Sequence, residues 1–296
     1  MIEYTRCPVC NSNLFDTVLE ATDFLVSGEL FKISECHECT LRFTNPVPDE
    51  NEIEKFYKSE DYISHSNTSQ GLINKLYQLV RNYTLHSKRK LIEKEAGLKS
   101  GTMLDIGCGT GEFLNTMKNS GWEVYGVEPD EGAQQIANRK FQLEIKIPKK
   151  LFEFTADFFD VITMWHVLEH IHHLDKNMTQ LTNILKPDGT LFIAVPNYHS
   201  FDAKYYDSGW AAYDVPRHLY HFTVQAIVTL LERFGLKLKK LKMMPFDSFY
   251  VSMLSEKYKK EAGSLLRAMS IGLKSNLKAI PHTGRCSSLI YFVKKK

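Results

Sequence analysis

Residues 102–111 read TMLDIGCGTG, an apolar run that contains Asp105 and passes straight into a loop with glycine at every second position. Glycine has no Cβ, so the backbone at Gly107, Gly109 and Gly111 can turn sharply and lie against a ligand. Amide N–H groups at the start of a following helix would face an anionic part of that ligand. The stretch therefore predicts a strand, a ligand-binding loop and a helix, in that order.

The spacing of these glycines argues against a dinucleotide site. The dinucleotide fingerprint is G-x-G-x-x-G, and Glu112 stands where its last glycine should be. A second signal lies downstream, because Glu128 follows Gly111 by 17 residues, the distance that one helix and one strand would span. A carboxylate at the end of that strand suits the two hydroxyl donors of a ribose.

From residue 101 onward, apolar runs alternate with helical stretches, which is typical of a parallel sheet covered by helices on both faces. The expected strands are 102–106, 123–127, 143–147, 159–164 and 191–195. The expected helices are 112–120, 131–140, 165–171 and 176–185. After a long loop at 197–222, we expect a helix near 223–234, a strand near 236–243, a basic amphipathic helix at 250–280 and a last strand at 288–293.

The glycine loop, Glu128 and the strand pattern together resemble the class I S-adenosylmethionine-dependent methyltransferases. The resemblance implies a Rossmann-like seven-stranded sheet with helices on both faces. It also implies that S-adenosylmethionine is bound by Asp105, Gly107, Cys108, Gly109, Gly111 and Glu128. The alternative is a nucleotide-binding or purely structural turn. Many relatives also carry an acid that contacts the adenine, but here the corresponding stretch, 149–152, is KKLF and leaves that contact unassigned.

The run 160–171, DVITMWHVLEHI, resembles the segment after the fourth strand of small-molecule methyltransferases, including those that O-methylate ubiquinone precursors. Trp165 and His166 are the candidates for lining the cofactor, because a π face or a lone pair would meet its positive sulfonium. Glu169 and His170 are either ligands of a divalent ion, as the related segment is in some relatives, or a hydrogen-bonded core pair.

The segment 197–222 is rich in Trp, Tyr and His and leaves the carboxyl end of the fifth strand, where open α/β sheets bind substrates. We expect it to form the acceptor pocket, with Asp214, His218 and His221 as a candidate base unit, since His is the natural base at neutral pH. The stretch HLYHFT resembles a piece of nucleotide-sugar C-methyltransferases whose His is the base, which favours His218. Those enzymes have Tyr where this chain has Val215, so a substrate hydrogen bond or a structural role stays open.

Two C-x-x-C pairs, separated by 25 residues, stand near the start of the chain: Cys7, Cys10, Cys36 and Cys39. This spacing is typical of two zinc knuckles that share one four-thiolate site. Four protein ligands leave no position for water, so the zinc would be structural and the unit would be unfolded without it. His37 is a possible substitute ligand, and unligated buried thiols are the alternative. Cys286 has no partner and is expected to be a packing residue.

These signals divide the chain into a zinc ribbon at 1–48, a helical linker or lid at 49–98 and a methyltransferase domain at 99–296. A ribbon ending in C-x-x-C and an N-P step before a cofactor domain resembles many bacterial methyltransferases, which often act on envelope sugars or lipids. No apolar run of 18 residues and no secretory signal occurs at the N-terminus. We therefore expect a cytoplasmic protein.

The formal charge of +2 hides an asymmetry along the chain. Residues 1–232 carry 22 Lys and Arg against 32 Asp and Glu, a net −10, whereas residues 233–296 carry 15 against 3, a net +12. Such a basic tail can contact nucleic acid, an anionic membrane surface or a phosphorylated or lipid-linked substrate. The alternative is a solvated, lysine-rich helix face.

The expected function is methyl transfer to a small molecule: a sugar, a quinone-like ring or a lipid-linked envelope precursor. The alternative is a ribosomal RNA methyltransferase, because one such family also places a four-ligand zinc ribbon before this fold, and the basic tail could bind phosphates. The aromatic segment 197–222 and the lack of an RNA-stacking motif favour a small molecule. A non-catalytic binding module would need a broken cofactor loop, and this loop is intact.

Overall fold

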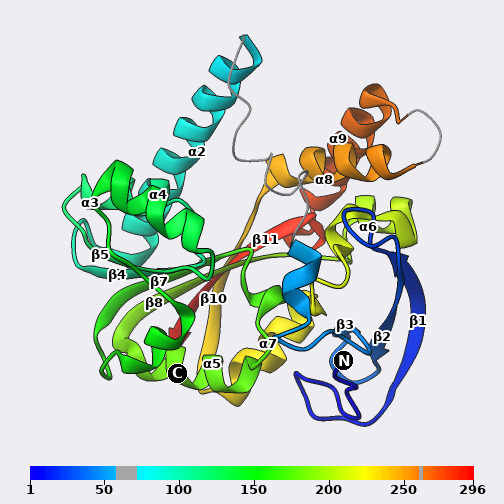
Figure 1. Ribbon diagram of the computed structural model, residues 1–296, viewed down its shortest axis with the longest axis horizontal. Helices are drawn as coiled ribbons and strands as arrows, with labels where there is room; N and C mark the ends of the chain where they lie inside the picture. The colour runs from blue at the N-terminus through cyan, green and yellow to red at the C-terminus, as the bar shows by residue number, and fades with distance from the viewer. Residues whose placement is uncertain (58–71, 260–262) are drawn as a thin grey trace.

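A seven-stranded sheet forms the centre of the computed structural model, which describes residues 1–57, 72–259 and 263–296. Its strands are β4 (Thr102–Ile106), β5 (Glu123–Val127), β6 (Ile145–Lys146), β7 (Phe159–Trp165), β8 (Leu185–Pro196), β10 (Leu236–Met243) and β11 (Ser288–Lys295). In space they follow the order β10-β11-β8-β7-β4-β5-β6 (Figure 1). The pairs among β4 to β8 are parallel, and β11 runs antiparallel to β8 and β10. The expected α/β fold is confirmed.

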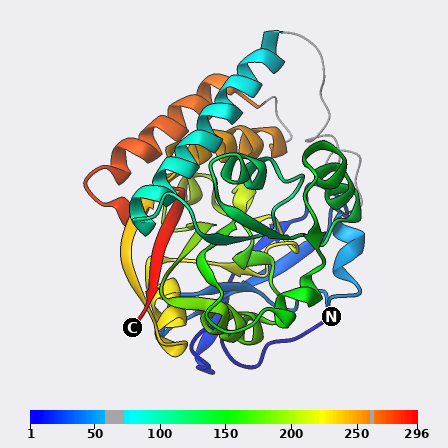
Figure 2. The same cartoon turned by 90° about the vertical axis from the view of Figure 1, so that its left-hand side faces the viewer.

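Helices cover both faces of this sheet. One face carries α2 (Leu72–Ala96), α3 (Glu112–Lys118) and α4 (Glu131–Phe141), and the other carries α5 (Leu174–Ile184) and α7 (Val224–Arg233). Successive strand residues point to opposite faces. On β8, Phe192 and Ala194 therefore pack in the core beneath α2 and α3, while Leu191 and Ile193 pack in the other core. Figure 2 shows α2 as a long helix that extends beyond the sheet.

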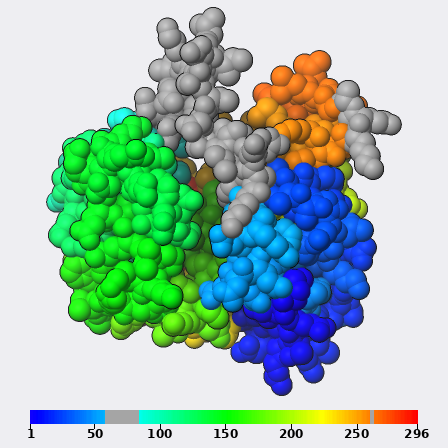
Figure 3. Space-filling view, in the orientation of Figure 1, coloured from blue at the N-terminus to red at the C-terminus, as the bar shows by residue number. Residues whose placement is uncertain are grey.

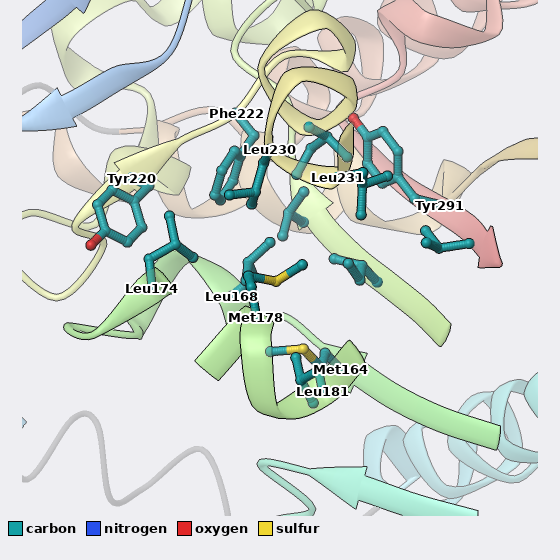
Figure 4. Packing of buried hydrophobic residues seen from close by; sticks show 14 of the residues in the cluster. Met164, Leu168, Leu174, Met178, Leu181, Tyr220, Phe222, Leu230, Leu231 and Tyr291 are labelled. Atoms are coloured by element: carbon teal, nitrogen blue, oxygen red, sulfur yellow. The ribbon is translucent and has the colours of Figure 1, made fainter. Parts of the chain in front are cut away.

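The core beneath α5 and α7 also includes part of the segment 197–222. Met178 of α5, Leu230 of α7 and Tyr291 of β11 meet Phe222 in this core, where all four side chains are buried (Figure 4). The segment that was expected to bind the acceptor is thus anchored at its end by the main hydrophobic core.

A second sheet is built around the N-terminal ribbon. Its strands are β1 (Phe15–Thr22), β2 (Leu30–Cys36), β3 (Arg42–Thr44) and β9 (Tyr220–His221), in that spatial order. β3 pairs antiparallel with β9, so that Arg42 lies opposite His221 and Phe43 opposite Tyr220. The ribbon expected at 1–48 therefore shares a sheet with the segment 197–222.

Short 3₁₀ helices fill several connections: η1 (Ile53–Tyr57), η2 (Pro148–Glu153), η3 (Leu168–His170), η4 (Asp207–Gly209), η5 (Ala211–Tyr213) and η6 (Thr283–Arg285). Within the linker expected at 49–98, residues 58–71 lie outside the described residues, and the helical spacing after them corresponds to α2. Across the described ranges, every helix is either too short or too polar to serve as a membrane span.

The prediction of a single helix at 250–280 is wrong. The structure has two antiparallel helices there, α8 (Pro245–Tyr258) and α9 (Leu265–Ala279), joined by bonds such as Ser248 Oγ to the carbonyl oxygen of Gly272 at 3.2 Å. Gly263 marks the break, because a Cβ there would lie 2.3 Å from the carbonyl oxygen of Glu256. The chain folds back too closely at this point for a side chain to fit.

Two other local predictions need correction. The segment 197–222 is not an irregular loop, since it contains α6 (Phe201–Tyr206) and β9, and the Ser200 hydroxyl caps α6 by accepting a bond from the Ala203 amide at 3.2 Å. The helix expected at 165–171 is absent, because β7 continues to Trp165 and His166 then takes a left-handed φ of 57°, which a helix cannot accommodate.

Candidate active site

A ligand-binding crevice is expected where the strand order reverses, between β4 and β7. The chain adds β5 and β6 on one side of β4, and then β7 and β8 on the other. In open α/β sheets, the carboxyl ends of the strands at such a point bind ligands. The glycine loop follows β4, while Trp165 ends β7 and His166 comes next. The structure thus brings the two segments predicted to line the cofactor to the same crevice.

The glycine loop has the backbone conformation that its sequence predicts. Gly107, Gly109 and Gly111 have φ values of 68°, 55° and 79°, in the left-handed region that favours glycine. A Cβ at Gly107 would lie 2.4 Å from Val167 Cγ2, so only glycine fits between the loop and that side chain. A Cβ at Gly109 would meet nothing within 4 Å, so the outer side of the loop has room for a ligand against the backbone.

Glu128 follows β5 and is linked to the glycine loop. Its carboxylate accepts bonds from the amides of Gly109 at 2.8 Å and Asp130 at 3.0 Å. The side chain is largely buried, and this burial raises its pKa in spite of the two amide bonds. A carboxylate fixed in this way still has lone pairs for further donors. Its role toward a ribose stays a prediction.

Asp105 lies in the interior rather than on the ligand side. It accepts a bond from the Thr163 hydroxyl at 2.5 Å, and burial raises its pKa to about 7 although the Thr163 bond and the nearby Lys88 charge oppose this. The Cys108 thiol is also buried, and burial raises its pKa too. Asp105 therefore ties β4 to β7 beneath the loop, and its predicted contact with the cofactor is untested.

Lys88 is a site residue that sequence reasoning missed. It extends from α2, and its Nζ lies 4.1 Å from the centre of the Trp165 ring and 6.0 Å from that of Phe113. Burial lowers its pKa, against the opposing charges of Asp105 and Asp247. The linker helix thus places a cation beside the glycine loop. The helical spacing of apolar residues predicted α2. It could not show which lysine of that helix lies beside the glycine loop.

His166 is held as a cation at the end of β7. Its Nε2 lies 3.1 Å from Asp247 Oδ2, and its Nδ1 lies 3.5 Å from Glu169 Oε1. Burial alone would lower its pKa, but the two carboxylates outweigh burial and raise it to about 10. A protonated imidazole has no lone pair to offer a sulfonium, and the predicted place of His166 beside the cofactor stays a prediction. Sequence reasoning missed Asp247, whose only local signal is its place in the first turn of α8.

Glu169, His170 and His218 form a cluster of acceptors. One ring nitrogen of each histidine and a Glu169 oxygen lie within 4.8 Å of one another. The Nδ1 atoms of His170 and His218 donate to the carbonyl oxygens of Arg217 at 3.0 Å and Ala212 at 2.8 Å, which leaves each Nε2 as an acceptor in the neutral ring. Burial lowers the pKa of His170 to about 4.

Glu169 is fully buried, and neither of its oxygens has a hydrogen-bond partner among the described residues. Burial would raise its pKa, but the contact with His166 and the neighbouring histidines lowers it on balance, so the carboxylate is charged. A buried acceptor without a partner is costly. The cluster is therefore suited to a ligand that brings protons or positive charge, either a hydroxyl group or a divalent cation.

The structure brings only part of the predicted base unit together. Asp214 Oδ2 lies 3.9 Å from His218 Nε2, while its Oδ1 accepts bonds from Arg217 at 2.7 and 3.0 Å. His221 lies on β9, where its ring packs edge-on against Tyr213 at 5.1 Å and its centre is 6.5 Å from that of His218. Burial holds the pKa of His221 well below its ordinary value. His221 is thus set back from the acceptor cluster.

The ribbon holds the backbone that carries His218. The Thr44 hydroxyl donates to the carbonyl oxygen of His218 at 2.8 Å, one residue beyond the β3–β9 pairing. Arg217, which is buried, donates to Asp23 of the ribbon at 2.9 Å. The space-filling view shows the ribbon (blue) beside the sheet domain (green), with the surface hollowed between them (Figure 3). The acceptor side of the site is therefore built jointly by the ribbon and the sheet domain.

The four ribbon cysteines have the geometry of a metal site. The Sγ atoms of Cys7 and Cys39 are 3.5 Å apart, those of Cys10 and Cys36 are 3.4 Å apart, and all four lie within 4.8 Å. A tetrahedral zinc with bonds of about 2.3 Å would separate its sulfurs by roughly 3.8 Å. These donors fit a structural zinc.

Comparison with known proteins agrees with this geometry. Residues 78–241 match a family model described as a methyltransferase domain. A ubiquinone biosynthesis O-methyltransferase of Pseudomonas paraeruginosa is 31% identical over 114 residues, 36% of this chain and 49% of that protein. Its counterpart in Coxiella burnetii is 28% identical over 174 residues, 56% of this chain and 72% of that protein. The chain thus spans about half the length of the Pseudomonas relative.

Among solved structures, the fold resembles that of magnesium protoporphyrin IX methyltransferase from Synechocystis, which was determined with bound S-adenosylhomocysteine. The TM-score is 0.54 at 13% identity, over 84% of this chain and all of that chain. At this level of identity the likeness concerns the fold.

Proposed function

Because the chain belongs to the S-adenosylmethionine-dependent methyltransferases, we propose that it methylates a small molecule bound between the end of β7 and the segment 197–222. The observation that carries this proposal is the buried acceptor cluster of Glu169, His170 and His218 at that place, whose carboxylate is held among the described residues by one long contact, to His166 at 3.5 Å. This cluster follows β7, and the glycine loop follows the neighbouring strand β4.

On the cofactor side, the glycine loop would lie against the methionine part of S-adenosylmethionine. Glu128, fixed by two amide bonds, would accept the ribose hydroxyls, and the Lys88 ammonium would meet the methionine carboxylate. Trp165 would present its ring near the sulfonium. Bound in this way, the cofactor supplies a methyl carbon already activated by its positive sulfur.

On the acceptor side, His218 Nε2 would take the proton of an acceptor hydroxyl as the methyl group arrives in line. The cofactor would supply the methyl group as its S–CH₃ bond breaks and the O–CH₃ bond forms, and His218 Nε2 would hold the released proton while S-adenosylhomocysteine leaves. The bond from Nδ1 to the Ala212 carbonyl fixes this tautomer, and the Glu169 carboxylate would stabilise the imidazolium that results. Asp214, 3.9 Å from Nε2, would add to that effect.

The acceptor we favour is a hydroxylated, quinone-like ring. The Pseudomonas and Coxiella relatives are named for ubiquinone biosynthesis, and the fully buried Glu169 suits a flat, mostly apolar ring. A sugar or a lipid-linked envelope precursor is the second choice. Methylation of ribosomal RNA is less well supported, because the acceptor cluster is buried rather than open to a nucleic acid.

The cofactor assignment is tested by calorimetry with S-adenosylhomocysteine. Glu128→Ala should weaken binding at least about 100-fold, since two charge-assisted hydrogen bonds are lost. Glu128→Gln should weaken it less, because the amide keeps one acceptor. Glu123→Ala, on the same strand but exposed, is the matched control and should bind as the wild type does. Unchanged binding by Glu128→Ala would overturn the assignment.

The acceptor is tested by a labelled-methyl assay that compares catechol-type rings, nucleotide sugars, undecaprenyl-linked sugars and total RNA. Transfer to a catechol ring is the expected result, and transfer to RNA alone would contradict the proposal. The same assay with and without Mg²⁺ asks whether the cluster holds a divalent cation. If turnover requires the ion and Glu169→Gln abolishes both ion binding and turnover, His218 is a ligand rather than the base.

A further inference from the structure

The outer face of α9 is apolar and exposed. Six large side chains along α9 and its last turn are 45% to 84% exposed: Leu265, Leu266, Met269, Leu273, Leu277 and Ile280. At about 100° per residue they lie within an arc of roughly 120° of the helix surface. We call these six residues the apolar stripe. Such a stripe normally faces a core, but on this helix it faces outward.

The core-facing side of α9 is a different set of residues. Small or buried side chains pack against α6 and α8: Ala268, Ile271, Gly272, Ser275 and Ala279. Ser275 donates to Asp202 of α6 at 2.5 Å, and Phe249 of α8 fills the space beside Gly272. α9 is therefore already anchored in the protein by its inner side, and the apolar stripe is not needed to hold it.

Basic residues border the stripe. Arg267, Lys274 and Lys278 are exposed along α9, and the helix contains no Asp or Glu. Among the described residues, Arg267 pairs with Glu256 at 3.7 Å, and the Lys278 ammonium lies 3.9 Å from the centre of the Phe201 ring. The outer surface of α9 is thus an apolar band beside a positive one. Helices with this pattern lie in the interface of anionic bilayers, where the apolar side chains insert among the acyl chains and the cations meet the headgroups.

We propose that the apolar stripe and the basic edge of α9 bind the surface of an anionic phospholipid membrane. The helix would lie flat on the membrane, since its inner side stays packed on α6 and α8. The α8–α9 pair projects from the molecule (Figure 1). The inference stands apart from the proposed methyl transfer and does not depend on the identity of the acceptor.

A second copy of the chain is a poorer fit to this face. In a two-fold symmetric dimer the same patch meets itself, so Lys274 and Lys278 of one copy would approach the same residues of the other. Like charges brought together in this way oppose association. An anionic surface instead satisfies the apolar and the basic parts of the face at once.

The test is co-sedimentation of the purified, zinc-loaded chain with vesicles. The vesicles are phosphatidylcholine alone or phosphatidylcholine mixed with phosphatidylglycerol. The wild type should bind the mixed vesicles, and Leu266→Ser/Leu273→Ser should weaken that binding at least about tenfold. Lys274→Glu/Lys278→Glu should weaken it by a similar factor and reduce its salt dependence.

Two control variants match these changes elsewhere on the surface. Leu30→Ser removes an apolar side chain that is 65% exposed on the ribbon, and Lys149→Glu/Lys239→Glu reverses two exposed charges. Both should bind mixed vesicles as the wild type does. Zinc content and S-adenosylhomocysteine binding check that every variant is folded. Vesicle binding itself is measured without any methyl-transfer assay.

Three results would overturn the proposal. The first is failure of the wild type to bind the mixed vesicles. The second is equal loss of binding in the α9 variants and in the controls. The third is a wild-type dimer in size-exclusion chromatography that Leu266→Ser/Leu273→Ser converts to monomers, because the stripe would then be covered by a second copy.

Discussion

The 24 consecutive residues from Asp105 to Glu128 contain most of the predicted cofactor-binding residues, whereas the proposed acceptor side is collected from distant parts of the chain. Glu169 and His170 follow β7, His218 comes from the segment 197–222, and Asp23 and Thr44 of the ribbon support that segment. A local site keeps its shape as long as one strand-loop-helix unit is folded. The acceptor side depends on two sheets being in register with each other.

The largest expected effect tests whether the acceptor side can be lost while the cofactor side stays intact. Cys36→Ser removes a thiolate of the zinc cluster, so the ribbon and the β3–β9 pairing should be lost. Methyl transfer should fall at least about 1,000-fold, because structural zinc contributes most of the folding free energy of such units. Affinity for S-adenosylhomocysteine should change little. Cys286→Ser changes a buried thiol outside the cluster and is the control. Equal losses of methyl transfer in both variants would contradict the idea that the ribbon specifically supports the acceptor side.

A second prediction concerns the two histidines of the acceptor side. His218→Gln should reduce turnover by about 100- to 10,000-fold, the usual contribution of a general base, without changing cofactor affinity. His221→Gln should reduce it far less, since His221 packs against Tyr213 and is set back from the cluster. Steady-state kinetics and calorimetry on both variants check this, and equal losses of turnover would show that His218 acts only in packing.

A third prediction measures how firmly the ribbon is joined to the acceptor segment. Arg217→Met should lower the free energy of unfolding by about 3–5 kcal/mol, because it leaves the buried Asp23 without its cation. Lys150→Met removes an exposed pair with Glu153 at 2.7 Å and should cost less than about 1 kcal/mol. Urea denaturation gives both values. A small cost for Arg217→Met would mean that the junction is weaker than its geometry suggests.

The smallest effect concerns the cofactor side and depends on pH. Burial raises the pKa of Asp105 to about 7, above the 3.8 of an ordinary Asp. The folded chain therefore keeps a proton that the unfolded chain releases, so this group lowers stability as the pH rises from about 4 to 7. Asp105→Asn should stabilise the protein at pH 8 and leave its stability almost unchanged at pH 4. Thermal unfolding of the wild type and of Asp105→Asn at the two pH values measures this. The same stability difference between the two proteins at both pH values would show that the pKa of Asp105 is not raised.

The contrast between a local cofactor side and a dispersed acceptor side also explains what the sequence could predict. The order of strands and helices, the glycine loop and the position of Glu128 follow from local patterns, and the seven-stranded sheet confirms the fold that they imply. The cluster of four cysteines was also predictable, because two short spacings define it. Each of these features depends on residues that lie close together in the chain or on a repeated period.

Other features depend on tertiary packing, and the sequence alone could not place them. Lys88 and Asp247 reach the crevice from α2 and α8, which have no fixed spacing to the residues they approach. The expected helix at 250–280 was wrong because α8 and α9 are both apolar at helical steps, so the period continues across the fold-back. Gly263 was the available signal. The pairing of β3 with β9 had no signal in either segment.

The pairing of β3 with β9 also sets an order for assembly during synthesis. The ribbon leaves the ribosome first, but the partner of Arg42 is His221, which is made 179 residues later. Until then one edge of the ribbon sheet has unpaired backbone groups, which can pair with another chain. A contact so distant in sequence forms slowly. Early zinc binding would limit this exposure, so metal supply should influence the yield of folded protein as well as its final stability.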